Sequence, residues 1–154
     1  MKIPSIKSNK LALIYGILLG DGCLSKVGSK HYFISVAGSI IEDLPFFQEV
    51  VVPLLKEFVS NNIKIQKRIK QKELHICFTN RKLFEFLVKI GFPIGKKGTK
   101  VKIPDHFSKK CLKNIVKGYF ENRVLNYYKG YASKQNLKTM KAKFGDFLGI
   151  RNKK

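Results

Sequence analysis

The sequence predicts an α+β protein in which helices alternate with pairs of antiparallel strands. Two observations lead to this fold class. Helical periodicity alternates along the chain with pairs of short extended segments, and turn-forming residues separate the members of each pair. Strands joined by short turns pair in antiparallel fashion, and each pair has one apolar face that helices can cover. The predicted order over residues 11–90 is helix, hairpin, helix, hairpin, helix, or αββαββα.

The first predicted helix, at about residues 10–20, is apolar and contains two glycines on one face, Gly16 and Gly20. A glycine inside a helix costs about 1 kcal/mol relative to alanine, so two of them indicate that another backbone packs closely there. Asp21 follows at the end of the helix, and Gly22 is expected to provide the C-terminal turn. Because that end of a helix carries partial negative charge, Asp21 needs a compensating cation, which is the first indication of a metal.

Turn residues and apolar spacing define the other elements before residue 91. They are the hairpin strands 23–27 and 31–37, a helix at about 42–60 that Pro53 kinks or divides, the strands 63–70 and 73–78, and a helix at 81–90 capped by Asn80. In the second hairpin, Ile63, Ile65 and Ile69 are expected on a buried face, with basic residues on the other face. A two-stranded ribbon with a basic face fits a groove of DNA.

The charge of the chain points to a polyanionic partner. The 154 residues include 31 Lys+Arg and 10 Asp+Glu, which gives a formal net charge of +21. This balance favours nucleic acid first and an anionic membrane surface second. Through residue 41 the only acidic residue is Asp21, so its carboxylate is not explained as a solubility feature.

Several other classes of protein are disfavoured. No apolar run reaches the roughly 18–20 residues that cross a bilayer, and the N-terminus does not read as a secretory signal. The three cysteines and three histidines lack the spacing of a disulfide framework or a zinc site. We therefore expect an intracellular protein, in the cytoplasm, the nucleoid or an organellar matrix, with no membrane partner and no small-molecule cofactor.

The segment Ile14–Gly22, IYGILLGDG, resembles the motif of the LAGLIDADG homing endonucleases, and it keeps the first glycine, the catalytic acid and the final glycine. The stretches 38–58 and 81–104 resemble the helix and linker that follow this motif in archaeal-type members with two motifs. The resemblance covers residues 11–148 and is strongest up to residue 104. It implies a saddle of antiparallel strands on double-stranded DNA, with two motif helices packed through their glycines and an acid at the end of each.

The resemblance also implies a function and a set of site residues. The function is sequence-specific DNA cleavage, in which Asp21, with Gly20 beside it, holds Mg²⁺ or Mn²⁺. Lys97 is the candidate for a basic catalytic residue near the metal, and Gly118 is the helix-packing counterpart of Gly16 and Gly20. The expected nucleic-acid contacts are Lys26, Lys30, Lys64, Gln66, Arg68, Lys70, Lys72 and His75.

The second motif departs from the family. Residues 1–92 are expected to form the first repeat, 93–107 a basic linker, and 108–154 a degenerate, truncated second repeat. In the second motif, Arg123 and Val124 stand where the acid and the final glycine belong. Arg123 paired with Asp21 would leave no metal.

This departure leaves alternatives open. The chain is a pseudo-dimer with one active acid that nicks weakly or not at all, a homodimer through the helix at 11–20, or a decayed reading frame that keeps only nucleic-acid affinity. Two further hypotheses are a maturase-like binder of RNA or DNA and a generic basic protein of ribosomal or membrane-surface type.

Overall fold

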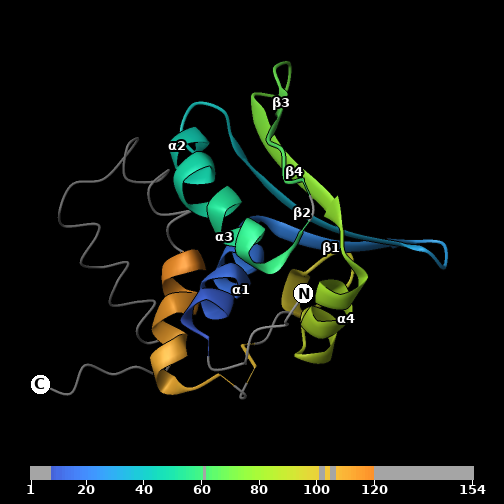
Figure 1. Cartoon of the computed structure of the whole chain (residues 1–154), viewed down its shortest axis with the longest axis vertical. Helices are drawn as coiled ribbons and strands as arrows, with labels where there is room; N and C mark the ends of the chain where they lie inside the picture. The colour runs from blue at the N-terminus through green and yellow to red at the C-terminus, as the bar shows by residue number, and fades with distance from the viewer. Residues whose placement is uncertain (1–7, 61, 101–102, 105–106, 120–154) are drawn as a thin grey trace, which may run out of the picture.

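The computed structural model of the chain describes residues 8–60, 62–100, 103–104, and 107–119. Its elements are α1 (Asn9–Asp21), β1 (Gly22–Val27), β2 (His31–Ser39), α2 (Leu44–Phe46), the π-helical turn η1 (Phe47–Val51), α3 (Val52–Phe58), β3 (Gln66–Arg68), β4 (Glu73–Thr79), α4 (Arg81–Lys89), the 3-10 turn η2 (Gly98–Lys100) and a helix over residues 109–119. The predicted αββαββα order is confirmed (Figure 1). The truncated second repeat predicted for residues 108–154 lies outside the described residues beyond residue 119.

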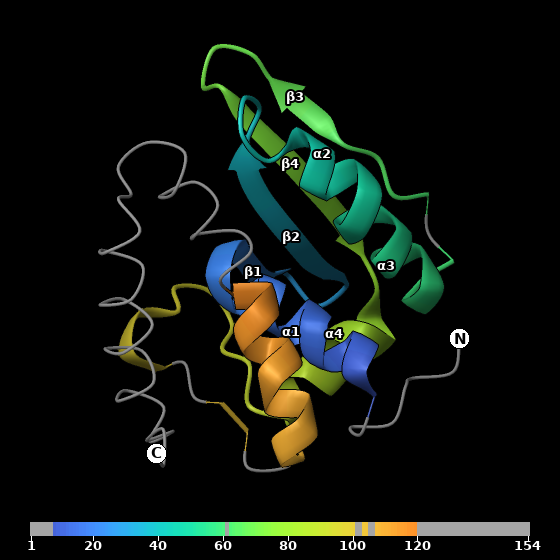
Figure 2. The same ribbon diagram turned by 90° about the vertical axis from the view of Figure 1, so that its left-hand side faces the viewer.

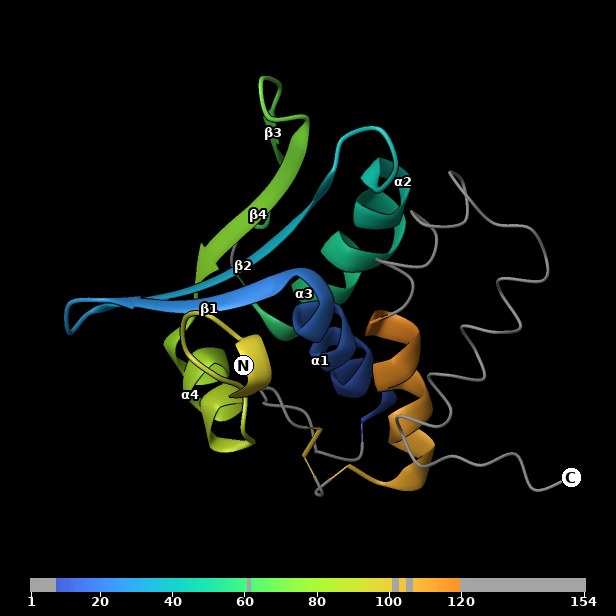
Figure 3. The same cartoon turned by 180° about the vertical axis from the view of Figure 1, so that it is seen from behind.

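The four strands form one antiparallel sheet in the order β1-β2-β4-β3. Opposite residues of antiparallel strands share a face, and the row of Leu24, Ile34 and Phe78 marks the face that is buried. The labelled helices lie on this side, and we call the other side the open face (Figure 1). The strands bend so that the β1–β2 and β3–β4 hairpins point in different directions, with the open face inside the bend (Figures 1 and 3).

The hydrophobic core is built around α1. Ser8 caps its first turn, since the Ser8 side chain accepts a hydrogen bond from the Leu11 backbone N–H. Tyr15 packs between the rings of Phe92 and Phe107, at centroid distances of 5.5 and 5.3 Å. None of the helices in the described ranges is long and apolar enough to cross a membrane.

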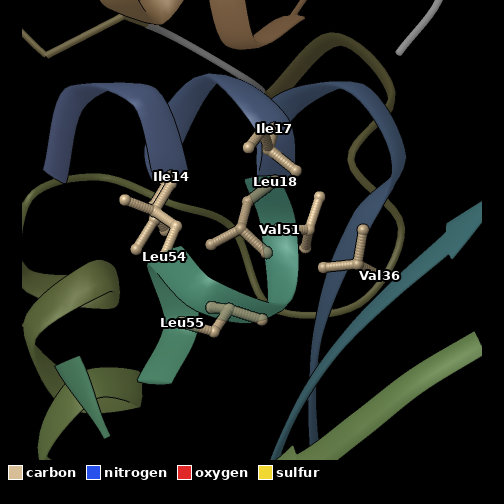
Figure 4. A pocket seen from close by; sticks show the side chains of 7 residues that line it. All are labelled: Ile14, Ile17, Leu18, Val36, Val51, Leu54 and Leu55. Carbon is tan, nitrogen blue, oxygen red and sulfur yellow. The ribbon is translucent and has the colours of Figure 1, made fainter. Parts of the chain in front are cut away.

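Apolar side chains from α1, β2, η1 and α3 meet under the sheet (Figure 4). They are Ile14, Ile17, Leu18, Val36, Val51, Leu54 and Leu55, and the gap between them is about 10 Å³. A gap of this size has room for about one water molecule and is lined by no polar side chain, so the core holds no ligand site here.

Pro53 divides the second helical stretch, as the sequence predicted. Proline has no N–H and its ring clashes with the carbonyl four residues earlier in an α-helix. The widened π turn Phe47–Val51 precedes it, with the Val52 N–H donating to the Phe47 carbonyl, and α3 begins at Val52. The π turn therefore accommodates the proline, and the helical stretch changes its geometry at this point without being interrupted by a loop.

Two local predictions were wrong. The strand expected over residues 63–70 is only Gln66–Arg68, because the chain already turns over residues 69–72 with Lys72 at φ +53°. Ile69 lies in this turn and is 72% exposed, instead of lying on the buried face. Gly22 forms no left-handed turn: its φ of −90° and ψ of 162° are those of an extended residue.

Candidate functional site

Asp21 stands at the junction of the core helix and the sheet. It is the last residue of α1 and is half-buried, and Gly22 begins β1 without an intervening loop. A Cβ at Gly22 would lie 2.5 Å from the Leu18 Cα atom, so only glycine lets the strand leave the helix this closely. The helix before it and the strand after it therefore fix the backbone of Asp21.

The helix over residues 109–119 packs against the middle of α1 through glycines (Figure 2). A Cβ at Gly16 would overlap the backbone of Ile115, lying 2.8 Å from its carbonyl carbon and 2.9 Å from its Cα atom. A Cβ at Gly118 would overlap the Leu13 carbonyl oxygen and lie 2.9 Å from the Ile17 nitrogen. The two helices thus touch backbone to backbone.

This contact has the symmetry of a pair of related helices. Gly16 contacts Ile115, which lies three residues before Gly118. Gly118 contacts Leu13, which lies three residues before Gly16. Both helices run in the same direction, towards the sheet (Figures 1 and 2). Asp21 lies five residues after Gly16, and Arg123 lies five residues after Gly118 in the sequence. Arg123 is outside the described residues. Since 109–119 occupies this face of α1, a homodimer through the same glycines would need that helix to leave.

Lys97 reaches the end of α1 from a distant part of the chain. Its Nζ donates hydrogen bonds to the carbonyl oxygens of Leu18, Leu19 and Gly20, at 3.0, 2.9 and 2.9 Å. The last carbonyls of a helix have no partner within the helix, and an ammonium has three protons to donate. Lys97 therefore caps the last turn of α1 next to Asp21.

The linker places Lys97 by running along β1 (Figure 3). Leu24 and Ile94 form a parallel bridge, and the Gly95 N–H donates to the Leu24 carbonyl at 2.7 Å. The Cys23 thiol lies 3.9 Å from the Gly95 carbonyl oxygen. This part of the basic linker is thus docked on the edge of the sheet, so the Lys97 side chain starts from a fixed backbone.

The described residues at the end of α1 include two oxygen donors that a divalent ion could use. No group of three or more His, Cys, Asp or Glu residues among the described residues is arranged to hold a metal. Mg²⁺ is commonly bound by one or two carboxylates together with phosphate oxygens of a substrate and water. The Asp21 carboxylate and the Gly20 carbonyl are oxygen donors of this kind, and they fit an ion whose other ligands come from a bound phosphate.

The open face carries small, polar and aromatic side chains. By strand register it presents Cys23, Ser25, Val27, His31, Phe33, Ser35, Ala37, Ser39, Gln66, Arg68, Glu73, His75, Cys77 and Thr79. Arg68 is the one permanently charged cation of this set, and its Nη1 pairs with the Glu73 carboxylate at 3.5 Å. Of the residues expected on the polar face of the second hairpin, Gln66, Arg68 and His75 lie on the open face, and Glu73 adds a negative charge to it.

The expected lysine contacts lie around the open face instead of on it. Lys30 is in the β1–β2 turn, Lys70 and Lys72 are in the β3–β4 turn, and Lys64 precedes β3; all four are exposed. Lys26 pairs with Tyr32 on the helix-covered face, where its Nζ lies 5.2 Å from the centre of the Tyr32 ring. Lys30, Lys70 and Lys72 thus mark the turns of the two hairpins, Lys64 lies before β3, and Lys26 lies away from the open face.

His75 sits in a small charged network on the open face. Its Nδ1 lies 3.4 Å from Nη2 of Arg68. Burial lowers the pKa of His75, the positive charge of Arg68 lowers it further, and the Glu73 carboxylate opposes both. The ring therefore stays neutral to a lower pH than an exposed histidine, and can present one donor and one acceptor.

Sequence reasoning missed several contributors to this site. The capping oxygens belong to the backbone of Leu18 and Leu19, which the sequence marks only as apolar. The available signal was that α1 has no basic residue in its last turn, so the charge that balances Asp21 must come from another segment. Ser25, Phe33 and Thr79 were also missed, because only the strand register assigns them to the open face.

No protein-family model and no curated protein sequence matches the chain. Solved structures of the homing endonuclease I-DmoI are similar to it. The complex of I-DmoI with DNA and Ca gives a TM-score of 0.55 at 16% identity, covering 74% of this chain and 56% of that chain. A structure of mesophilic variants of I-DmoI gives 0.55 at 16% identity, over 74% and 61%.

A third structure, of an I-DmoI variant with nicked target DNA and Mn, gives a TM-score of 0.53 at 16% identity, over 74% of this chain and 60% of that chain. The chain thus spans about three fifths of the length of the structures it matches. At this identity the similarity establishes a shared fold, and it does not by itself establish an activity.

Proposed function

We propose that the chain is a DNA endonuclease of the homing type, in which Asp21 holds the catalytic divalent metal. The observation that carries this proposal is the place of Asp21: it ends a core helix that is packed through glycines against a second helix, and it directly precedes the sheet. The fold is shared with structures of a homing endonuclease in complex with DNA.

The open face and its surroundings suit a DNA duplex. Lysines at the hairpin ends contact phosphates as point charges, which positions the duplex without reading sequence. Neutral donors and acceptors of the open face, such as Ser35, Gln66 and His75, read base edges. The net charge of +21 supplies long-range attraction to the polyanion.

Asp21 and the backbone around it would hold the metal against a phosphate. When bound, a divalent ion activates a water molecule and stabilises the leaving oxygen. The chain would contribute the Asp21 carboxylate and the Gly20 carbonyl, and we assign Lys97, whose ammonium bonds that carbonyl in the unbound chain, as the basic residue beside them. With Arg123 in the corresponding place of the second motif, we expect this single acidic site to cut one strand.

The test is a cleavage selection from a randomised duplex library in Mg²⁺ or Mn²⁺, followed by single-turnover nicking of the selected duplex. Asp21→Asn keeps the size of the side chain and removes the charge. We expect it to slow nicking at least about 1000-fold, because an amide is a poor metal ligand. The matched control is Glu49→Gln, an exposed carboxylate of η1.

Glu49→Gln should nick at the native rate. Cleavage that survives Asp21→Asn, or that needs no divalent metal, contradicts the proposed function.

A second candidate is a nucleic-acid binder without cleavage, acting on DNA or, like a maturase, on RNA. The sequence favours it at one point: Arg123 replaces the second acid, so the chain offers one carboxylate where the resemblance implies two. Tight, salt-sensitive binding with no strand cut in Mg²⁺ or Mn²⁺ would establish this candidate. Competition between duplex DNA and structured RNA would then identify the ligand.

A further inference from the structure

We propose that Lys97 is a positioning residue that serves as a built-in cation: without DNA, its ammonium takes the place of a metal ion at the end of α1 and holds the linker there. The inference concerns the unbound chain and stands whether or not the chain cuts DNA. It rests on contacts that involve no catalytic step.

The geometry is that of a small oxygen cage. Three successive carbonyls, from Leu18 to Gly20, converge on one Nζ at 2.9–3.0 Å. Carbonyl oxygens that converge on a single point are also the donors that bind hard metal cations. The Gly20 carbonyl, which is the expected metal ligand, is one of the three. An ammonium and a divalent cation cannot both sit in this cage, because their charges repel.

The charge distribution of α1 requires a cation at this point. The helix has no acidic residue in its first turn and no basic residue in its last turn, and it ends on the carboxylate of Asp21. Both the helix dipole and Asp21 are therefore negative at one place. Lys97 supplies the positive charge, although it lies 77 to 79 residues after the carbonyls that it contacts. The contacts of Ile94 and Gly95 with Leu24 fix the backbone that precedes it.

The consequence is a chain whose stability does not depend on metal. A protein whose site needs a bound ion gains stability when that ion is added, in proportion to its occupancy. With the ammonium in place, Mg²⁺ has little to add until a DNA phosphate contributes further ligands. Removal of the ammonium should open the cage to Mg²⁺ and make the stability of the unbound chain depend on metal.

The experiment is thermal unfolding of the full chain without DNA, in EDTA and in millimolar MgCl₂. Lys97→Met removes the ammonium and keeps a long side chain. Lys96→Met, at the adjacent exposed position of the same linker, is the matched loss of charge. We expect Lys97→Met to lower Tm in EDTA by about 5–10 °C, because three charged hydrogen bonds are lost.

Mg²⁺ should then raise the Tm of Lys97→Met by several degrees. It should change the Tm of the native chain and of Lys96→Met by less than about 1 °C. Adding Asp21→Asn to Lys97→Met should remove this gain, and Lys97→Arg should restore part of the native Tm in EDTA. A native Tm for Lys97→Met in EDTA, or no response of that variant to Mg²⁺, overturns the proposal.

The native chain provides a second measurement if Lys97→Met does not fold. An ammonium held by three carbonyls exchanges its protons slowly, so ¹⁵N-labelled lysine should show one protected Nζ signal in the cold. We expect this signal to persist when Mg²⁺ is added without DNA. Proton exchange of all lysine ammonium groups at the rate of exposed lysines, or loss of the signal in Mg²⁺, overturns the proposal.

Discussion

The middle and the end of α1 are held by opposite kinds of contact. In the middle, Gly16 and Gly118 bring two backbones together with no side chain between them, and the contact is steric and uncharged. At the end, next to Asp21, the ammonium of Lys97 donates to the last carbonyls, and the contact is electrostatic. The middle of α1 therefore depends on close steric packing, and its end depends on charge. The two regions should respond differently to substitution.

The largest expected effect on stability is at the glycine contact. Gly16→Ala or Gly118→Ala places a Cβ within 3 Å of backbone atoms that cannot rotate away, and the helices must separate. We expect each to lower the free energy of unfolding by about 2–3 kcal/mol, although alanine is the better helix former. Denaturant unfolding measures this.

Lys117→Ala, at an exposed position next to Gly118, is the control and should change stability little. A Gly16→Ala variant as stable as the native chain would show that the helices do not touch in solution.

The next effect concerns DNA affinity and the lysines of the hairpin ends. We expect Lys30→Ala, Lys70→Ala and Lys72→Ala together to weaken DNA binding about tenfold at moderate salt and to reduce the salt dependence, since each removes one phosphate contact. The control variant removes Lys56, Lys82 and Lys89, which are exposed on α3 and α4. Equal losses in both triple variants would contradict an interface on the open face.

A smaller effect on stability is expected at the end of the helix. Asp21→Asn removes a negative charge from the negative end of α1, so we expect it to change the free energy of unfolding by less than about 1 kcal/mol. The comparison with Gly16→Ala is direct, because both residues belong to the same helix. Unfolding caused by Asp21→Asn would mean that this residue supports the fold instead of the chemistry.

The smallest expected effect is a change in the titration of His75. The Arg68 cation disfavours the charged imidazolium, so Arg68→Gln should raise the pKa of His75 towards its ordinary value. Glu73→Gln removes the opposing carboxylate and should lower the pKa of His75 further. An NMR titration of the His75 ring measures both shifts, and shifts of the opposite sign would contradict this network.

Much of the fold was predictable because side-chain patterns record which face is buried. Leu74, Ile76 and Phe78 alternate with polar residues in the sequence, and all three are buried on one face of β4. Asn80 caps α4 as expected, since its side chain accepts a hydrogen bond from the Leu83 N–H. The pattern failed at Ile69, because alternation continues through a segment regardless of where the hairpin turns. The extended backbone of Gly22 was missed for a similar reason, because glycine occurs both in turns and where two backbone segments pack closely.

The site was less predictable, because its contacts are made by backbone atoms. The isolation of Asp21 in a basic stretch and the two glycines of α1 are visible in the sequence. The cage around Lys97 consists of carbonyl oxygens, which every residue has, so no residue pattern reveals it. The distribution of lysines around the open face depends on strand register, and one residue of shift would move Lys26 to that face.

The central claim is that Asp21 holds a divalent ion against DNA, and iron-mediated cleavage of the protein backbone tests it most directly. Fe²⁺ replaces Mg²⁺ in the complex with the selected duplex, and ascorbate with peroxide then cuts the polypeptide next to the bound ion. We predict cuts at the junction of α1 and β1 that require DNA and disappear in Asp21→Asn. The same cuts in Asp21→Asn, or cuts confined to another segment, would contradict the claim.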